Sequence, residues 1–276
     1  MEYENKPEFS EKKPGETEKK AVPTTKNARQ PIKILAVGDV HGREVLSRIE
    51  PANYDRIVFI GDYVDTHYEA SYSDVMILEN LKKIIEFKKR DPGKVILLLG
   101  NHDVHYMYHD EVNECSGFRK SMLADLQWLF NENSALFDMA CQYSNTLFTH
   151  AGVSNTWYRR YSADIQQEIS KVRGQAGLED NLVLSEKFNY LRSSIAGRKI
   201  LFKISGLRNF PRDIYQSGGI IWADKQETAH DYLKGYNQVV GHTVVGSIEK
   251  KMGDYDESSS ITYIDTENRE FLEVRI

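Results

Sequence analysis

Short apolar runs that stop abruptly at polar residues recur along this chain from Ile32 onward. One such run ends at Gly100 and is followed by Asn, His and Asp, side chains that a buried strand normally excludes. Near-continuous β-branched and leucine-rich runs of this length are typical of strands covered on both faces. The pattern therefore predicts strands that each end in polar residues, in the stretches IKILAVGDVHG, RIVFIGDYVD, KVILLLGNHD, NTLFTHAG and YNQVVGHT.

Amphipathic segments lie between these runs. The stretch SDVMILENLKKIIEFKKR at 73–90 predicts a packed helix, and the alternation of strands with helices predicts an α/β fold. In such folds, ligands gather outside the carboxyl ends of the strands, which is where all the polar clusters fall. The last strands, in SSSITYIDTENREFLEVRI, predict a hairpin that turns at Glu267–Arg269.

The two ends of the chain differ in composition. Residues 1–31 hold four of the seven prolines and have few apolar side chains, which predicts a disordered tail, read as a solvated leader in preference to a partner-binding arm. Residues 32–276 are expected to form one domain. Within it, about 154–216 carries no motif but has helical spacing, which predicts a helical insertion over the mouth of a site or, equally, a simple packing layer.

Charge and composition narrow the class of protein. A net charge of −5 gives no basic excess for binding along nucleic acid. The two cysteines, Cys115 and Cys141, are far apart and outside any CxxC pattern, so a disulfide framework or thiolate metal site is not expected. No stretch has the apolar length of a membrane span or a signal core, so we expect a cytoplasmic protein with no membrane partner.

The polar residues after the strands are suited to binding metal ions. They offer carboxylate and amide oxygens and imidazoles without thiolate, a mixture that favours Mn, Fe or Zn. One carboxylate can bridge two ions, and a water held between them becomes a hydroxide nucleophile, so the chemistry that fits is phosphoester hydrolysis. The candidate ligands are Asp39, His41, Asp62, Asn101, His150 and His242.

These stretches resemble the ordered signature of calcineurin-like metallophosphoesterases, in particular the serine/threonine phosphatase-type branch, with bacterial and phage phosphatases and the symmetrical dinucleoside tetraphosphatases as near relatives. The resemblance implies an αββα sandwich of two mixed sheets flanked by helices, with a helical insertion near the active site. Five blocks in family order make a chance match improbable. The blocks are GDVHG at 38–42, GDYVD at 61–65, GNHD at 100–103, HAG at 150–152 and GHT at 241–243.

The resemblance also implies roles for single residues. His102 corresponds to the general acid that protonates the leaving oxygen, and Asp65 to the carboxylate that accepts its ring N–H. Asp103 corresponds to a supporting residue. The implied metal ligands are Asp39 and His41 for the first ion, Asp62 as the bridge, and Asn101, His150 and His242 for the second.

Two departures from the family pattern bear on the substrate. Protein phosphatases of this branch have Arg-Gly after the second block, whereas Thr66 follows Asp65 here; Arg43 or Arg119 is the expected replacement for binding phosphate. Many phosphodiesterases of the superfamily carry GHxH, but Val244 occupies the last position. This second departure favours a phosphatase-type site.

The sequence thus predicts a binuclear-metal phosphatase acting on phosphomonoesters, with Mn favoured and Fe, Zn or Ni as alternatives. The substrate is a phosphorylated small molecule, nucleotide or phosphoprotein, and the oligomeric state stays open. A dinucleoside polyphosphate hydrolase is the alternative enzyme, and an inactive metal-binding scaffold is the alternative outside enzymes. The histidines outside the motifs, among them His67 and His105, are expected to be ordinary polar residues.

Overall fold

Two sheets of five strands each organise the part of the chain that this computed structural model describes, namely residues 1, 31–66, 72–174, 181–208, 211–253 and 258–276. The predicted tail falls almost entirely on residues 2–30, and His67 also lies outside the described residues. Residues from Pro31 to Ile276 form one structural unit.

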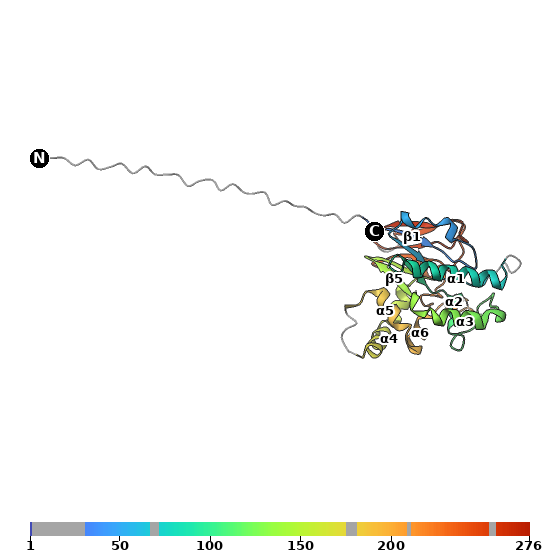
Figure 1. The fold of residues 1–276 in the computed structure, drawn as a ribbon. Helices are drawn as coiled ribbons and strands as arrows, with labels where there is room; N and C mark the ends of the chain where they lie inside the picture. The colour runs from blue at the N-terminus through green and yellow to red at the C-terminus, as the bar shows by residue number, and fades with distance from the viewer. Residues whose placement is uncertain (2–30, 67–71, 175–180, 209–210, 254–257) are drawn as a thin grey trace. The chain divides into compact units, whose positions relative to one another are not determined.

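The first sheet, which contains the strand labelled β1 in Figure 1, has the strand order β10-β1-β2-β3-β4. Strands β1 to β4 run parallel to their neighbours, and β10 pairs antiparallel with β1. Because β1, β2 and β3 are parallel neighbours, the loops that follow them lie at one edge of the sheet. The strands are β1 (Lys33–Val37), β2 (Arg56–Phe59), β3 (Val95–Leu98), β4 (Phe137–Asp138) and β10 (Leu272–Arg275).

The second sheet has the order β5-β6-β7-β9-β8. Its three central strands, β6, β7 and β9, are parallel, and the two outer strands are antiparallel to their neighbours. The predicted strands that precede HAG and GHT are therefore adjacent. The strands are β5 (Ala140–Tyr143), β6 (Thr146–Thr149), β7 (Asn237–Val240), β8 (Glu249–Met252) and β9 (Ser260–Tyr263).

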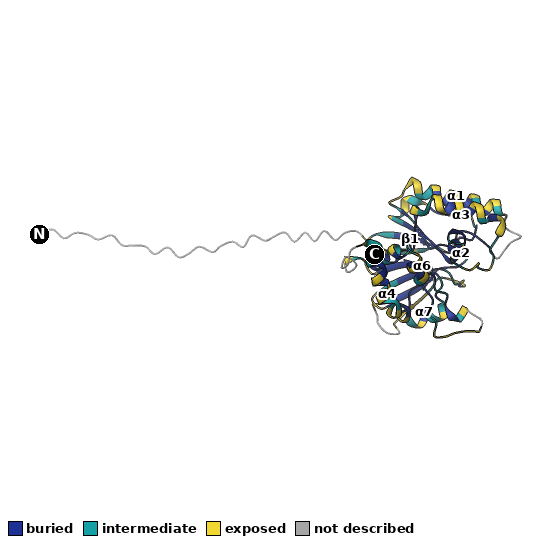
Figure 2. Cartoon of the chain, turned by 90° about the horizontal axis from the view of Figure 1, so that it is seen from below, coloured by how far each residue is buried: buried dark blue, intermediate teal, exposed yellow. Residues whose placement is uncertain are grey.

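Helices cover the outer faces of both sheets. The predicted helix at 73–90 is α1, which begins after Ser73, whose side chain accepts the backbone N–H of Met76. Figure 2 shows exposed residues on the outer sides of α1 and α3 and buried residues along the strands. The helices are α1 (Asp74–Arg90), α2 (Asn101–Met107), α3 (Leu123–Glu132), α4 (Asn155–Arg173), α5 (Leu184–Leu191), α6 (Ile195–Leu201) and α7 (Lys225–Asp231).

Alternation along the strands separates the layers. On β1, Ile34 packs with Phe148 and Val239 of the second sheet, whereas Leu35 belongs to the cluster that includes the apolar face of α1. On the far side, Ile261 packs with residues at the end of α7. Because successive strand residues point to opposite faces, this pattern produces a helix–sheet–sheet–helix sandwich. The predicted αββα architecture is confirmed.

The predicted C-terminal hairpin is wrong. A turn does occur there, with Glu267 and Asn268 at φ values of 55° and 58°. However, β9 pairs with β7 and β8 in the second sheet, while β10 pairs with β1 in the first. The turn therefore connects the two sheets, and no short-range pattern could show that the flanking strands choose different partners.

The region at 154–216 is helical where it is described. It contains α4, α5 and α6, which pack on one another, and α5 also packs on β5. Trp157 and Phe188 are completely buried with their rings 5.9 Å apart. These helices share the main apolar core, so this region packs on the sandwich.

A substitution at Phe148 tests whether the core lies between the two sheets. The side chain of Phe148 is fully buried between the sheets, so Phe148→Ala should lower the free energy of unfolding by about 3–5 kcal/mol in a denaturant titration. The control is Trp128→Ala on α3, where the ring is 63% exposed and the expected change is within about 0.5 kcal/mol. Similar losses in both variants would contradict a core at this interface.

Candidate metal centre

Residues from five different strand ends meet in this site. All the predicted metal ligands are buried except His242, which is half-buried. They converge because the carboxyl ends of β1 to β3 in one sheet face those of β6 and β7 in the other. The loop after β1 supplies Asp39 and His41, the loop after β2 Asp62, the start of α2 Asn101, and the loops after β6 and β7 His150 and His242.

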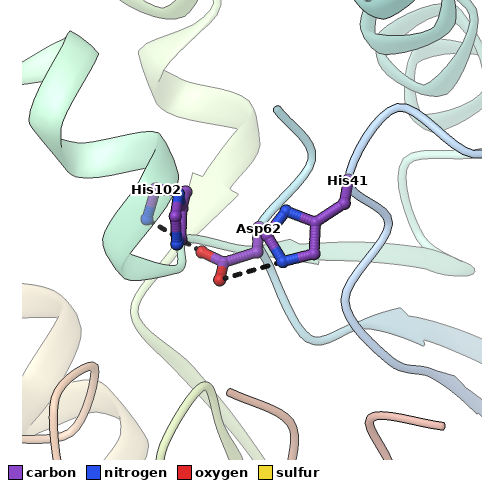
Figure 3. A group of neighbouring side chains, drawn as sticks. All are labelled: His41, Asp62 and His102. Atoms are coloured by element: carbon purple, nitrogen blue, oxygen red, sulfur yellow. Dashed lines mark hydrogen bonds and ion pairs between the residues drawn. The ribbon is translucent and has the colours of Figure 1, made fainter. Parts of the chain in front are cut away.

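The carboxylate of Asp62 lies at the centre of the cluster. Its Oδ2 is 3.3 Å from Nε2 of His150 and 3.8 Å from Nε2 of His41. Its Oδ1 accepts the backbone N–H of His102 at 2.9 Å. Figure 3 shows the carboxylate between His41 and His102. Asp62 therefore joins the loops of the first sheet to those of the second.

Three groups of potential ligand atoms occur among the described residues; one comprises Asp65, His102 and His105, and the other two share Asp62. The first of these two comprises His41, Asp62 and His102, and the second Asp62, His150 and His242, each with its atoms within 4.8 Å of one another. Oδ1 of Asn101 adjoins the second group, 2.9 Å from Nε2 of His150. A shared carboxylate between two imidazole-containing groups is an arrangement suited to two ions.

Hydrogen bonds from the backbone fix the histidine tautomers. Nδ1 of His41 lies 3.0 Å from the carbonyl of Val64, and Nδ1 of His150 lies 3.0 Å from that of Ile60. Since a carbonyl only accepts, each Nδ1 carries the hydrogen and a neutral ring directs its Nε2 lone pair toward Asp62. Burial lowers the pKa of His41 to about 4, so this ring is neutral near pH 7. Lone pairs facing a carboxylate fit a cation between them.

The carboxylate of Asp39 and Nε2 of His242 would also be stabilised by a nearby cation. Burial, followed by the charges of Asp265 and Asp62, raises the pKa of Asp39 well above its usual range. Nε2 of His242 is buried and has no hydrogen-bond partner among the described residues. Buried polar groups are normally paired, so these observations fit a divalent ion held by this donor set.

The backbone at the site is strained. His41, Asp62, Asp65 and His242 have φ values of 46°, 50°, 61° and 66°. Left-handed backbone is uncommon for residues with a Cβ and costs on the order of 1–3 kcal/mol at each position. It turns these side chains away from the strands that precede them and into the site.

Two glycines of the motifs leave room for carboxylates. A Cβ at Gly100 would lie 2.1 Å from Oδ1 of Asp62, and one at Gly241 would lie 2.0 Å from Oδ1 of Asp39. Neither glycine has a positive φ, so their role is the close approach of a side chain and not the turn itself.

Asp103 pins two of the loops together. Its Oδ2 accepts the backbone N–H groups of Asp62 and Gly100, both at 2.8 Å, and its Oδ1 accepts that of Tyr63 at 2.9 Å. Asp103 is completely buried. This position agrees with the supporting role that the sequence predicts for it.

His102 and Asp65 are in contact. Nδ1 of His102 lies 3.0 Å from Oδ2 of Asp65. Burial acts to lower the pKa of His102, but the charges of Asp62 and Asp65 outweigh it, and the pKa is raised. Burial acts to raise the pKa of Asp65, but hydrogen bonds to His102 and His105 outweigh it, and the pKa is lowered. The pair thus favours a charged ring beside a carboxylate.

His105 supports the same carboxylate, a role that the sequence does not predict. The backbone N–H of Cys115 donates to Nδ1 of His105 at 2.9 Å, so Nε2 carries the hydrogen, and this atom lies 2.8 Å from Oδ2 of Asp65. The hydroxyl of Tyr106 donates to Oδ1 of Asp65 at 2.5 Å. The available signal was the spacing of His102 and His105, which places them on one helix face.

A cavity of about 380 Å³ opens onto these side chains. Of the two arginines predicted to bind phosphate, Arg43 lines it, whereas Arg119 is not among its lining residues and binds Asp74 at 2.8 Å. Arg208 also lines it, with Nε 3.2 Å from Asp224. Arg208 comes from the motif-free region, so no sequence signal could have identified it.

Trp222 and Val244 also line this cavity. The ring of Trp222 lies 5.5 Å from that of His242 at 86°, so this tryptophan is part of the cavity wall as well as of the fold. Val244 stands where a further histidine would have supplied another ligand, and its side chain is exposed to the cavity.

Comparison with known proteins identifies the family. Residues 32–246 match the family model described as calcineurin-like phosphoesterase. A curated protein of Schizosaccharomyces pombe, named as a candidate serine/threonine-protein phosphatase, is 30% identical over 129 residues, which cover 44% of this chain and 39% of that protein. The chain thus matches well under half the length of this relative.

One solved structure shows a similar fold. The crystal structure of a cold-active protein-tyrosine phosphatase of a psychrophile Shewanella sp. has a TM-score of 0.50 and 15% identity, covering 85% of this chain and 71% of that one. A second structure of a cold-active protein tyrosine phosphatase has a TM-score of 0.49 and 16% identity, covering 85% and 70%. Across the described residues, no helix has the length and apolar character needed to cross a membrane.

Asp103 allows the architecture of the site to be tested without an assay. Asp103→Ala leaves three buried N–H groups without their acceptor, and the free energy of unfolding should fall by about 3 kcal/mol or more. Asp103→Asn keeps one acceptor oxygen and should lose less. The control is Asp125→Ala at an exposed position of α3. A denaturant titration in chelator gives the comparison, and an unchanged Asp103→Ala protein would contradict the assignment.

Proposed function

The chain belongs to the calcineurin-like phosphoesterase family, and we propose that it hydrolyses phosphate monoesters with the help of two divalent metal ions. The observation that carries the proposal is the pair of ligand groups that share the buried carboxylate of Asp62. Bound ions would supply positive charge for the phosphate oxygens and lower the pKa of a water so that hydroxide is available near neutral pH.

The residues divide between two metal positions. Asp62 belongs to both groups and would be the bridging ligand. In the first position the other ligands would be His41, whose neutral Nε2 already faces Asp62, and Asp39, which comes from the same loop after β1 but belongs to neither group. The remaining ligands, on the side of the second sheet, would be Asn101, His150 and His242. Carboxylate, amide and imidazole donors without thiolate favour Mn, with Fe, Zn or Ni as alternatives.

His102 would donate a proton to the departing oxygen. Its Nδ1 is held by Asp65, its Nε2 would serve the substrate, and the residue lines the cavity. The carboxylates of Asp62 and Asp65 raise the pKa of His102, which favours the protonated ring that a general acid requires. His105 and Tyr106 would hold Asp65 in place and thereby fix the orientation of His102.

The phosphate group would be bound by Arg43 and Arg208. Both line the cavity, and both retain donors that a tetrahedral anion can accept. Each has an acidic neighbour, Glu267 at 3.6 Å and Asp224 at 3.2 Å, which holds the guanidinium beside the cavity. Arg119 plays no part in this proposal. The contact between His102 and Asp65 favours an active enzyme over an inactive metal-binding scaffold.

Metal removal tests the proposal directly. Hydrolysis of p-nitrophenyl phosphate should stop after chelation and return with added Mn, and metal analysis should find two ions per chain. Asp62→Asn should lose at least one ion, because it removes one of the two carboxylate oxygens of the shared ligand. The matched control is Asp125→Asn, which changes an exposed carboxylate. Full turnover by protein shown to be free of metal would contradict the proposal.

The general acid can be tested with a series of leaving groups. An alkyl alkoxide needs a proton to depart, whereas p-nitrophenolate scarcely does. His102→Ala should therefore lose roughly 10²–10⁴-fold in kcat/KM on an alkyl phosphate and much less on p-nitrophenyl phosphate. Asp65→Asn should show the same trend more weakly. With equal metal content in all variants, equal losses along the series would assign His102 to binding instead.

A further inference from the structure

A second cavity adjoins the proposed active site. It has a volume of about 290 Å³ and shares Asn101 and Trp222 with the first cavity. Its other walls come from α2 and from the end of α6, including Val104, Phe202 and Lys203. We call it the lysine cavity, because Lys199 and Lys203 line it. The shared residues place it directly beside the proposed phosphate site.

The third cation of this cavity, Arg198, is already engaged. Its Nε and Nη2 donate to Glu111 at 2.7 and 2.6 Å, and its Nη1 donates to the carbonyl of Arg192 at 2.7 Å. The guanidinium also stacks over Tyr108, 4.6 Å from the ring centre. Arg198 and Glu111 therefore cancel each other in charge and serve as a rigid part of the wall.

Lys199 and Lys203 have no such partner. Neither forms an ion pair within the portion of the chain that the structure describes; Lys199 is exposed and Lys203 is half-buried. Lys199 lies in α6 and Lys203 two residues beyond its end, and both line one cavity, where their like charges repel. The end of a helix favours nearby cations, which helps α6 to tolerate both. An anionic ligand in this cavity would pair with both lysines.

The remaining wall is partly apolar and aromatic, with polar side chains that include Asn113 and Gln216. Phe202 is buried and lines the cavity together with Val104 and Trp222. The ring of Trp222 in turn reaches the proposed metal ligand His242, at 5.5 Å. If the organic part of a bound substrate extends from the phosphate site along Trp222, it enters a cavity that offers both apolar surface and the two lysines.

We propose that the lysine cavity binds the alcohol part of the substrate and that this part carries its own negative charge, as a second phosphate or a carboxylate. The proposal rests on the proposed phosphomonoesterase activity and names its substrate class. The apolar wall binds the body of the alcohol, and Lys199 and Lys203 bind its anionic group. The enzyme then prefers phosphate esters of anionic alcohols to esters of neutral ones.

The test compares substrates that differ only in this charge. 4-(2-Carboxyethyl)phenyl phosphate and its N-methylamide have phenols of nearly equal basicity, so the chemical step makes the same demand on the enzyme. The carboxylate should be hydrolysed with a kcat/KM about tenfold higher, mainly through a lower KM, because the anion is held equally before and during reaction. The 4-(2-phosphonoethyl) analogue shows whether a phosphate-like dianion is preferred to a carboxylate.

Variants assign the preference to the cavity. The double change Lys199→Gln/Lys203→Gln should remove the preference and leave the amide substrate within about twofold of the unmodified protein. The control Lys83→Gln/Lys250→Gln removes the same charge from exposed residues that line neither cavity, and it should keep the preference. Loss of the preference in the control would assign it to overall charge and overturn the proposal.

Failure of this inference is distinguishable from failure of the proposed function. Equal kcat/KM for the charged and neutral esters, with turnover that depends on metal, would overturn the lysine cavity alone. If neither ester is hydrolysed with Mn, binding of the phenol 3-(4-hydroxyphenyl)propionate decides, measured by saturation-transfer NMR against its N-methylamide. Binding of the anion that is lost in the lysine double variant supports the cavity, and equal binding of anion and amide overturns it.

Discussion

The buried carboxylate of Asp62 is the group on which the architecture of the site depends. It lies between imidazoles from both sheets, and Asp103 holds its backbone in a left-handed conformation that would otherwise be unfavourable. A buried negative charge is costly unless it is paired, so the surrounding donors and a bound cation stabilise each other. The same carboxylate requires a glycine at position 100, because a Cβ there would occupy its space.

The sandwich explains why such strain is tolerated. Each loop at the site follows a strand whose residues pack on both faces, so the ends of the loops are fixed by core burial. The apolar core thereby supports a set of polar residues that would not assemble on their own. Asp65 shows the same principle on a smaller scale: His105 and Tyr106 hold it, and it holds His102.

Charge is distributed unevenly between the two adjoining cavities. The first contains the carboxylates and imidazoles, which fit divalent cations, and its arginines stand beside acidic partners. The second has two lysines without such partners and a partly apolar wall. Their contact through Asn101 and Trp222 gives one continuous surface on which metal, phosphate and the organic part of a substrate would each meet groups of suitable chemistry.

The sequence by itself determined the strands, the long helix at 73–90 and the residues that gather at the site, because short apolar runs and the polar blocks after them are local patterns. The αββα arrangement came with the family resemblance. Only the tertiary structure decided that β9 and β10 join different sheets, that His105 supports Asp65, and that Arg208, and not Arg119, lines the cavity. These features depend on contacts between residues far apart in the chain or on the direction of single side chains. The spacing of His102 and His105 places the two rings on one helix face, but it does not identify the carboxylate that they reach.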